Sequence, residues 1–114
     1  LNPISSLTTS TLVKICSDHE VRDVVKNMMN EAHEISKNLG IDKPFDVERR
    51  IEAAKAVGEH KTSMLQDLER DRPMEIDALV SSVQELGRIT KVPTPTIDTV
   101  LALVKLRAKE AKLY

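Results

Sequence analysis

The sequence predicts an all-α fold, in which residues 1–114 form one compact bundle of about five or six helices. Apolar residues recur at helical spacing in several long segments, whereas no short segment alternates apolar and polar residues for long. No Asn-Gly or Asp-Gly turn joins two apolar segments, as a tight β-hairpin would require. The length of 114 residues and the hydrophobic content of 40% fit a single domain with one core.

The first predicted helix covers residues 18–39 and has the clearest periodic pattern. Its apolar residues follow the helical period of about 3.6 and are Val21, Val24, Val25, Met28, Met29, Ala32, Ile35 and Leu39. Ser17 and Glu20 have the spacing of a capping box, in which each side chain pairs with a backbone amide of the first turn. Gly40 follows the last apolar residue and can take the left-handed conformation that ends a helix.

Two further helices are predicted from similar apolar stripes. One begins near Asp46, and its stripe comprises Val47, Ile51, Ala54 and Val57. The other runs from Glu75 to Ile89, and its stripe comprises Ile76, Leu79, Val80, Val83 and Leu86. Each stripe gives its helix one face that can be buried in a core.

A last helix is predicted to open at Thr94, because Thr94 can cap it and Pro95 suits the first helical position. The middle of this helix is apolar on all sides and contains Val100, Leu101, Leu103 and Val104. This pattern predicts a helix that lies inside the packing. The largely apolar run from Ile97 through Val104 could equally pack on a partner, so a non-catalytic interaction or dimerisation module, or a homodimer, stays open.

Composition excludes several classes of function. The net charge of −1 gives no field that favours nucleic acid or acidic lipid, and the two aromatic residues are too few for base stacking. No apolar run approaches the roughly 20 residues of a membrane span, and no signal peptide opens the chain, so a cytoplasmic protein is expected. The single cysteine, Cys16, lies in the apolar run "TLVKIC" and is predicted to be a reduced, buried thiol and not a nucleophile.

Motifs for nucleotide or metal binding do not occur. The three glycines cannot form G-x-G-x-x-G or G-x-x-x-x-G-K-[ST], so no nucleotide-phosphate loop is predicted in this chain. The three histidines lack the H-E-x-x-H spacing. His33, between Glu31 and Glu34, is predicted on a solvated helix surface and not at a metal site.

One polar stretch carries a resemblance to a known family. The segment "TSMLQDLERDRPMEID" is similar to the signature of the C-terminal domain of ketopantoate reductase, the NADPH-dependent 2-dehydropantoate 2-reductase. The matching residues are Ser63, Met64, Leu65, Gln66, Asp67, Glu75, Ile76 and Asp77. The segments "LNPIS" and "VPTPTIDTVLALVK" also resemble family segments, in the same order and at similar spacing, so the resemblance spans essentially the whole chain.

The resemblance implies a fold, a reaction and a cofactor. In this family an N-terminal Rossmann domain holds NADPH, and an all-helical C-terminal domain, like that of 6-phosphogluconate dehydrogenase, supplies most of the substrate site. The expected reaction transfers a hydride from NADPH to a 2-keto acid, 2-dehydropantoate, and gives pantoate for coenzyme A biosynthesis. The Rossmann domain and the family's general-acid lysine are absent from these 114 residues. The chain alone is therefore expected to contain no cofactor-binding residue and to be inactive.

The resemblance also implies roles for Ser63 and Glu75. The family serine that matches Ser63 helps to bind the substrate carboxylate; the alternative is that Ser63 only caps a helix, with Gln66 at capping-box spacing. The family glutamate that matches Glu75 contacts the substrate and the catalytic lysine, which makes Glu75 the candidate catalytic residue. Its alternative is a first-turn glutamate favoured by the helix dipole. Asp67 and Asp77 are read as caps or local hydrogen-bond anchors.

Asn2 and His60 complete the candidate substrate-binding set. Asn2 lies in the family's lysine-bearing helix and can line the cleft, although a plain helix-terminal residue is equally consistent with the sequence. His60 stands where family members often have a substrate-binding asparagine, and Thr62 and Met74 also depart from the family pattern. These departures leave a related 2-keto acid open as the substrate.

Pro73 divides this polar stretch. A proline inside a helix removes one backbone donor and clashes with the preceding turn. We therefore predict a short helix from about Ser63 to Arg70, a break at residues 71–73 and a new helix near Glu75. Folding back at the break is expected to bring Ser63 and Glu75 toward one cleft.

Overall fold

Seven α-helices and one π-helical segment make up the computed structural model, which describes residues 1–41 and 45–114. In chain order they are α1 (Asn2–Thr8), α2 (Leu12–Ser17), α3 (His19–Asn38), α4 (Val47–Val57), α5 (Ser63–Glu69), the π-helical segment η1 (Asp77–Ser81), α6 (Ser82–Thr90) and α7 (Pro95–Glu110). The described residues contain no strand, which confirms the all-α prediction. The predicted number of helices was lower because α1 and α2, of 7 and 6 residues, are too short to show a period.

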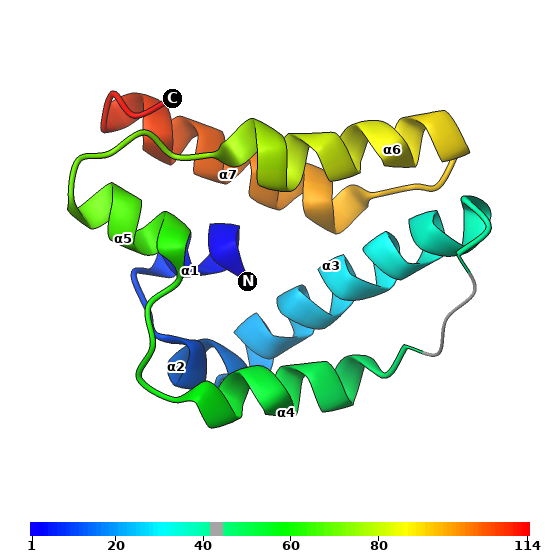
Figure 1. Ribbon diagram of the computed structural model, residues 1–114, viewed down its shortest axis with the longest axis horizontal. Coiled ribbons are helices and arrows are strands. Elements are labelled where there is room, and N and C mark those ends of the chain that lie inside the picture. Colours follow the sequence, from blue (N-terminus) through cyan, green and yellow to red (C-terminus); the bar gives the residue numbers. More distant parts are fainter. Residues whose placement is uncertain (42–44) are drawn as a thin grey trace.

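The helices form a flat molecule of 38 × 30 × 20 Å. The long helix α3 contacts α4 on one side and α6 and α7 on the other, while α1 contacts α5 and α7 (Figure 1). Helices α1 and α5 lie between the two parts of the molecule that α3 joins, one with α4 and the other with α6 and α7. This central position of α1 and α5 determines where the candidate site residues lie.

Two clusters of buried side chains form the core, and α7 contributes to both. One cluster joins α5, η1 and α7 through Met64, Met74, Ile76, Val80, Ile97, Leu101, Val104, Ala108 and Leu113. The other joins α1 to α4 with α7 through Ile4, Ile15, Cys16, Val25, Ile51 and Val100. Leu7 and Met28 pack against both clusters and link them.

Five residues of the predicted apolar faces are between 39% and 58% exposed, namely Leu39, Val57, Leu79, Leu86 and Leu103. Val57 ends α4, just before the chain turns at Gly58. The π turn inserts one residue into the helical repeat, so Gly87 and not Leu86 continues the buried face of α6. Helix α7 is not buried on all sides, because its buried residues follow one stripe and Leu103 faces away from it.

The predicted ends of α3 are partly confirmed. The N-cap is Asp18, whose Oδ1 accepts from the Val21 N–H (3.0 Å), and the predicted Ser17 cap is wrong because Ser17 belongs to α2. At the other end Gly40 has a φ of +83°, as predicted. The N–H of Ile41 donates to the Ser36 carbonyl (3.0 Å), which completes the glycine-terminated helix end.

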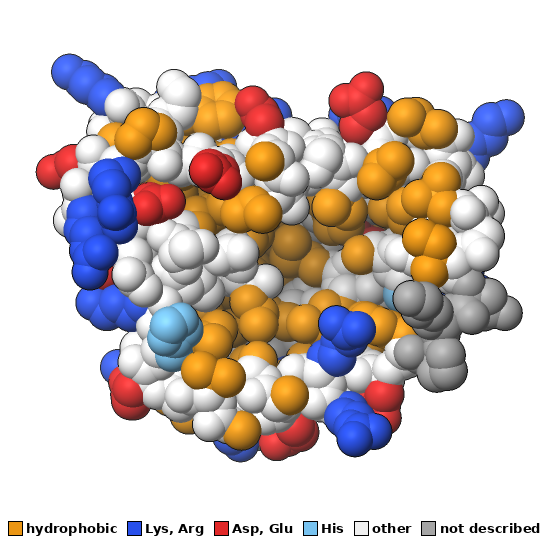
Figure 2. All heavy atoms as spheres, viewed as in Figure 1, with side chains coloured by type: hydrophobic (Ala, Val, Ile, Leu, Met, Phe, Trp, Pro, Cys, Tyr) orange, Lys and Arg blue, Asp and Glu red, His pale blue; other side chains and the backbone are white. Residues whose placement is uncertain are grey.

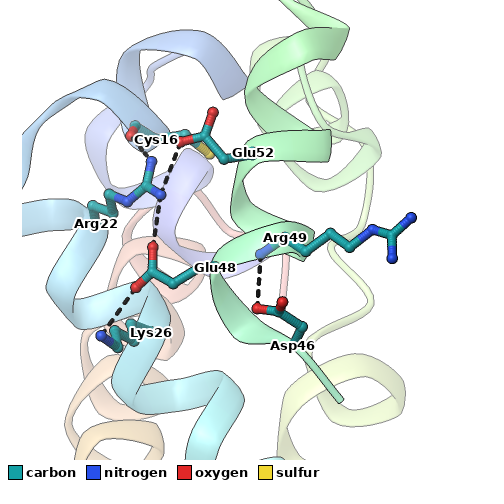
Figure 3. A network of polar contacts seen from close by, with 7 residues as sticks. All are labelled: Cys16, Arg22, Lys26, Asp46, Glu48, Arg49 and Glu52. Carbon is teal, nitrogen blue, oxygen red and sulfur yellow. Dashed lines mark hydrogen bonds and ion pairs between the residues drawn. The ribbon is translucent and has the colours of Figure 1, made fainter. Parts of the chain in front are cut away.

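Ion pairs on the surface join α3 to α4 (Figure 3). The Arg22 guanidinium contacts Glu48 (2.9 Å) and Glu52 (3.0 Å), and Lys26 contacts Glu48 (3.0 Å). Hydrogen bonds from Arg22 and then from Lys26 hold the pKa of Glu48 below its usual value. Arg22 also donates to the carbonyl of Cys16 (3.0 Å), so one side chain ties α4 to the end of α2.

Cys16 is 1% exposed, which confirms the prediction of a buried thiol. Burial raises the pKa of this thiol above its ordinary value, and the nearby Arg22 only partly opposes the shift. A thiol nucleophile needs a lowered pKa and access to solvent, so Cys16 has a packing role.

The residues around His33 differ from the prediction. His33 is half-buried and stacks on Phe45, with ring centroids 4.8 Å apart, and the Arg50 guanidinium lies 4.7 Å from the Phe45 centroid. Glu31 is also half-buried, and its two carboxylate oxygens accept from the N–H groups of Thr96 (3.0 Å) and Ile97 (2.9 Å). Glu31 therefore caps α7 from α3, a long-range contact that its local sequence does not indicate.

Candidate functional site

The predicted break between the two halves of the polar stretch is confirmed. Helix α5 ends at Glu69, Asp71 has a left-handed φ of 54°, and the next helical residues begin at Ile76. Pro73 lies in the non-helical segment between them. In Figure 1 the chain doubles back between α5 and η1, as the predicted arrangement requires.

A π turn follows the candidate catalytic residue, Glu75. The N–H of Ser82 donates to the Asp77 carbonyl, five residues earlier, in place of the usual four. Single π turns inside α-helices occur frequently at functional sites. Sequence periodicity gives no sign of this turn, because one inserted residue only shifts the apolar stripe.

The last residues of the chain hold the segment that carries Glu75. The N–H of Met74 donates to the Leu113 carbonyl (2.9 Å), and the Tyr114 hydroxyl donates to Asp77 Oδ1 (2.7 Å). Asp77 is therefore a hydrogen-bond anchor, as predicted. Glu75 itself is exposed and lies in a shallow depression lined by residues 73–78 and 112–114.

Hydrogen bonds from Tyr114 and then Ser81 lower the pKa of Asp77. The same contact with Asp77 raises the pKa of the Tyr114 phenol. Both shifts favour a neutral phenol that donates to a charged carboxylate.

Ser63 does not cap α5, so that alternative is wrong. The cap is Thr62, whose hydroxyl accepts from the Leu65 N–H (3.3 Å). The side chain of Gln66 does not complete a capping box either, because its amide donates to the Lys61 carbonyl (2.9 Å). Among the residues that the structure describes, the exposed Ser63 hydroxyl has no hydrogen-bond partner and is free to bind a ligand.

A buried chain of hydroxyls connects the start of α5 to Asn2. Ser5 Oγ donates to the Asn2 carbonyl (2.9 Å) and shares a further hydrogen bond with Thr62 Oγ1. Since a hydroxyl has one proton to donate, Thr62 must donate to Ser5 while it accepts from Leu65. Ser5 is 0% exposed, so this relay holds α1 against α5 out of contact with solvent.

Asn2 is half-buried and lines a mostly apolar cavity of about 210 Å³. Helices α1, α3 and α7 and the η1–α6 segment form its walls, with Val25, Met29 and Val83 among the lining residues. Figure 2 shows hydrophobic side chains gathered in a hollow on this face of the molecule. The Asn2 side chain therefore adds an amide group to an otherwise apolar wall.

His60 lies in the exposed loop between α4 and α5. Its carbonyl accepts from the Leu12 N–H (3.0 Å), and the Gly58 carbonyl accepts from the Val13 N–H (3.1 Å), so the loop is held to the start of α2. This contact fixes the backbone of His60 but leaves its side chain exposed.

Three of the four predicted site residues fall into two groups, while the His60 side chain lies exposed in the loop before α5. The relay through Ser5 and Thr62 ties Asn2 to the backbone next to Ser63, whereas Glu75 lies in the depression beside Tyr114. A cleft shared by Ser63 and Glu75 stays a prediction. Sequence reasoning missed Ser5 and Tyr114, because α1 is too short to show a buried face and the contact between Tyr114 and Asp77 spans 37 residues.

Neither a metal-binding cluster nor a membrane-spanning helix occurs among the described residues. No cluster of three or more His, Cys, Asp or Glu side chains in residues 1–41 and 45–114 could hold a metal ion. Within those same ranges, none of the helices combines the length and apolar character needed to cross a bilayer.

Comparison with known proteins identifies the fold. A family model of the C-terminal domain of ketopantoate reductase (PanE/ApbA) matches residues 1–108. A 2-dehydropantoate 2-reductase of Mesorhizobium japonicum is 61% identical over 113 residues, which are 99% of this chain and 35% of that protein. This chain therefore spans about a third of the length of its curated relative.

Two solved structures support the same family. A structure from Ralstonia solanacearum, assigned to the ketopantoate reductases, has a TM-score of 0.93 and 42% identity over 99% of this chain and 34% of its own. The 2-dehydropantoate 2-reductase of Methylococcus capsulatus has a TM-score of 0.89 and 31% identity over 97% of this chain and 39% of its own. The structure is thus a helical domain of the kind found in these reductases. The chain belongs to the ketopantoate reductase family and corresponds to its C-terminal domain.

Proposed function

We propose that this chain is the substrate-binding part of a longer reductase that converts a 2-keto acid, 2-dehydropantoate or a close analogue, to the 2-hydroxy acid. The observation that carries the proposal is the free hydroxyl of Ser63. It occupies the position of the family's carboxylate-binding serine, and Thr62 has taken over the capping role that would otherwise explain it.

Ser63 is proposed to donate a hydrogen bond to the substrate carboxylate. A hydrogen bond to a charged group is stronger than one between neutral groups, so this contact supplies affinity and orientation. Asn2 and His60 are proposed to line the same site, Asn2 through its amide and His60 in place of the asparagine that family members often have. The imidazole is bulkier than an amide, which is consistent with an analogue of 2-dehydropantoate as substrate.

Glu75 is proposed to hold the hydroxyl that forms on the substrate, or the ammonium of the general-acid lysine. A carboxylate next to an ammonium raises the pKa of that ammonium and holds it in the protonated form. The lysine can then give its proton to the alkoxide oxygen of the reduced substrate. NADPH, when bound, supplies the hydride that reduces the keto carbon.

The cofactor and the lysine are proposed to lie in the parts of the enzyme outside this chain. No glycine-rich phosphate loop occurs in the 114 residues, so the chain itself does not fit a dinucleotide. The remaining length of the relatives is proposed to contain the Rossmann domain. Its closure on this helical domain would exclude water from the reacting atoms.

Steady-state kinetics of the full-length protein test the proposal. Ser63→Ala should raise KM for the keto acid roughly ten-fold with little change in kcat, because it removes a contact that the ground state and the transition state share. Glu75→Gln should lower kcat about ten-fold or more, because it alters charge beside the reacting centre.

Matched controls are available on other faces of the domain. Ser17→Ala removes an exposed hydroxyl from the end of α2, and Glu85→Gln removes an exposed carboxylate from α6. Both should leave the kinetic constants unchanged. If Ser63→Ala and Glu75→Gln behaved like these two controls, the proposed substrate site would be refuted. The alternative, a non-catalytic interaction or dimerisation module, would then be favoured.

A further inference from the structure

We propose that Tyr114 is a positioning residue for Glu75, because the last residues of the chain hold the non-helical segment on which Glu75 lies. The proposal rests on the function proposed above for Glu75, which is the group that would touch the substrate. Tyr114 would act only through Glu75.

Two hydrogen bonds from the chain end flank Glu75. On one side the Met74 N–H donates to the Leu113 carbonyl (2.9 Å), one residue before Glu75. On the other side the Tyr114 hydroxyl donates to Asp77 Oδ1 (2.7 Å), two residues after it. In the tail, residues 112–114, Leu113 therefore holds one end of the segment and Tyr114 holds the other.

The backbone around Glu75 makes two local hydrogen bonds, from the Ile76 N–H to the Met74 carbonyl (3.0 Å) and from the Leu79 N–H to the Glu75 carbonyl (3.3 Å). Pro73 has no N–H to donate. Glu75 precedes the first helical residue, Ile76, so the Glu75 N–H has no helical carbonyl to which it can donate. The side chains of Met74 and Leu113 are buried, at 5% and 8% exposure, which shields the backbone bond between them from water. The tail thus adds a shielded long-range hydrogen bond to these local contacts.

Tyr114 is 49% exposed, and side chains of α7 and of the π turn lie beside its ring and hydroxyl. Lys105 and Lys109 on α7 lie 6.0 and 5.9 Å from the ring centroid, and Asp77 also accepts from Ser81 Oγ (2.8 Å). The carboxylate of Asp77 is therefore shared between the π turn and the tail. Loss of the phenol hydroxyl would free one end of the Glu75 segment without removing the ring that packs there.

A double-mutant cycle in the full-length enzyme tests this role. Tyr114→Phe should lower kcat about five-fold, the effect expected for one ordinary hydrogen bond that orders a reacting group. In a Glu75→Gln background the same substitution should have no further effect on kcat, because the group that Tyr114 positions is already lost. Thr99→Val is the control, since it removes an exposed hydroxyl hydrogen bond (3.0 Å) near the opposite end of α7.

A titration shows whether the hydrogen bond exists in solution. The difference in tyrosinate absorbance between the parent enzyme and Tyr114→Phe isolates this one phenol, and Asp77→Asn should lower its pKa.

The possible results separate this inference from the proposed function. If Glu75→Gln lowers kcat but Tyr114→Phe does not, the positioning role is refuted and the proposed function stands. An equal loss of kcat from Tyr114→Phe with and without Glu75 would also refute it, because the effect would not pass through Glu75. If Glu75→Gln leaves kcat unchanged, both the role of Glu75 and the positioning role fall.

Discussion

Thr62 and Ser63 are adjacent hydroxyl residues in opposite environments. Thr62 is buried, caps α5 and belongs to the relay that runs from Leu65 through Ser5 to Asn2. Ser63 is exposed, and its hydroxyl is not used by the fold within the described part of the chain. The first hydroxyl therefore has a structural role, and the second is available for the substrate contact that we propose.

The relay makes a prediction about stability. Thr62→Val removes the hydroxyl but keeps the shape of the side chain, so buried Ser5 loses a partner. The free energy of unfolding should fall by about 1–3 kcal/mol, the usual cost of leaving a buried polar group unpaired. Thr62→Ser keeps the hydroxyl and should cost less. Denaturant unfolding of the three proteins measures the difference.

Thr11 provides the matched control for this prediction. Its Oγ1 is buried, and no partner for it occurs among the described residues. Thr11→Val should therefore be neutral or stabilising, because it removes an unpaired hydroxyl. Equal destabilisation by Thr62→Val and Thr11→Val would show that the hydroxyl relay contributes nothing.

At this scale the sequence indicated the candidate residues but not which hydroxyl caps α5. The motif indicated Ser63, Glu75 and Asp77. Whether Thr62 or Ser63 caps the helix depends on where α1 places Ser5, which is 57 residues away in sequence. No local pattern contains that information.

The start of α7 depends on a side chain from another helix. Glu31 on α3 accepts from the Thr96 and Ile97 N–H groups, which are free donors in the first turn of any helix. The carboxylate also lies where the positive end of the helix dipole favours a negative charge. Helix α7 contributes to both core clusters, so its placement affects the whole domain.

Removal of this cap should therefore destabilise the domain. Glu31→Ala is expected to lower the free energy of unfolding by about 1–2 kcal/mol, the range measured for the loss of a helix cap. Amide hydrogen exchange at Thr96 and Ile97 should become faster. Glu34→Ala, one turn further along α3 and on the exposed surface, is the control; a loss of stability no larger than that of Glu34→Ala would contradict the cap.

Gly87 gives a second test at the level of elements, because it lies where α6 meets α3. A Cβ at this position would lie 2.8 Å from Thr94 Cγ2 and 3.3 Å from Ile35 Cδ1. Gly87→Ala should therefore destabilise by about 1–3 kcal/mol through overcrowding, although alanine is the better helix former. A gain in thermal stability would show that Gly87 packs less closely against Thr94 and Ile35.

Helix positions were largely predictable from periodicity and from Gly40, Pro73 and Pro95. The π turn was not, because an inserted residue leaves the residue types unchanged and only shifts the stripe. That shift explains why Leu86 was predicted in the core in place of Gly87. Leu103 was misplaced for another reason: a run of apolar residues does not show which side of α7 has no neighbour.

For the whole molecule, the arrangement connects segments that are far apart in the sequence and that carry the candidate site residues. Helix α3 joins two packed regions, and α1 and α5 lie between them. Asn2 is thereby tied to the backbone beside Ser63, and Leu113 and Tyr114, which follow α7, hold the segment that carries Glu75. The all-α class and the family signature were predictable from sequence, whereas these pairings depend on contacts between segments far apart in the chain.

The structure of the full-length protein with NADP⁺ and pantoate is the measurement that tests the central claim most directly. Our account predicts that Ser63 Oγ lies about 3 Å from a carboxylate oxygen of pantoate, within hydrogen-bond distance. It also predicts that the Glu75 carboxylate contacts the 2-hydroxyl of pantoate or the general-acid lysine. A pantoate carboxylate bound by other groups, with Ser63 and Glu75 facing solvent, would contradict the account.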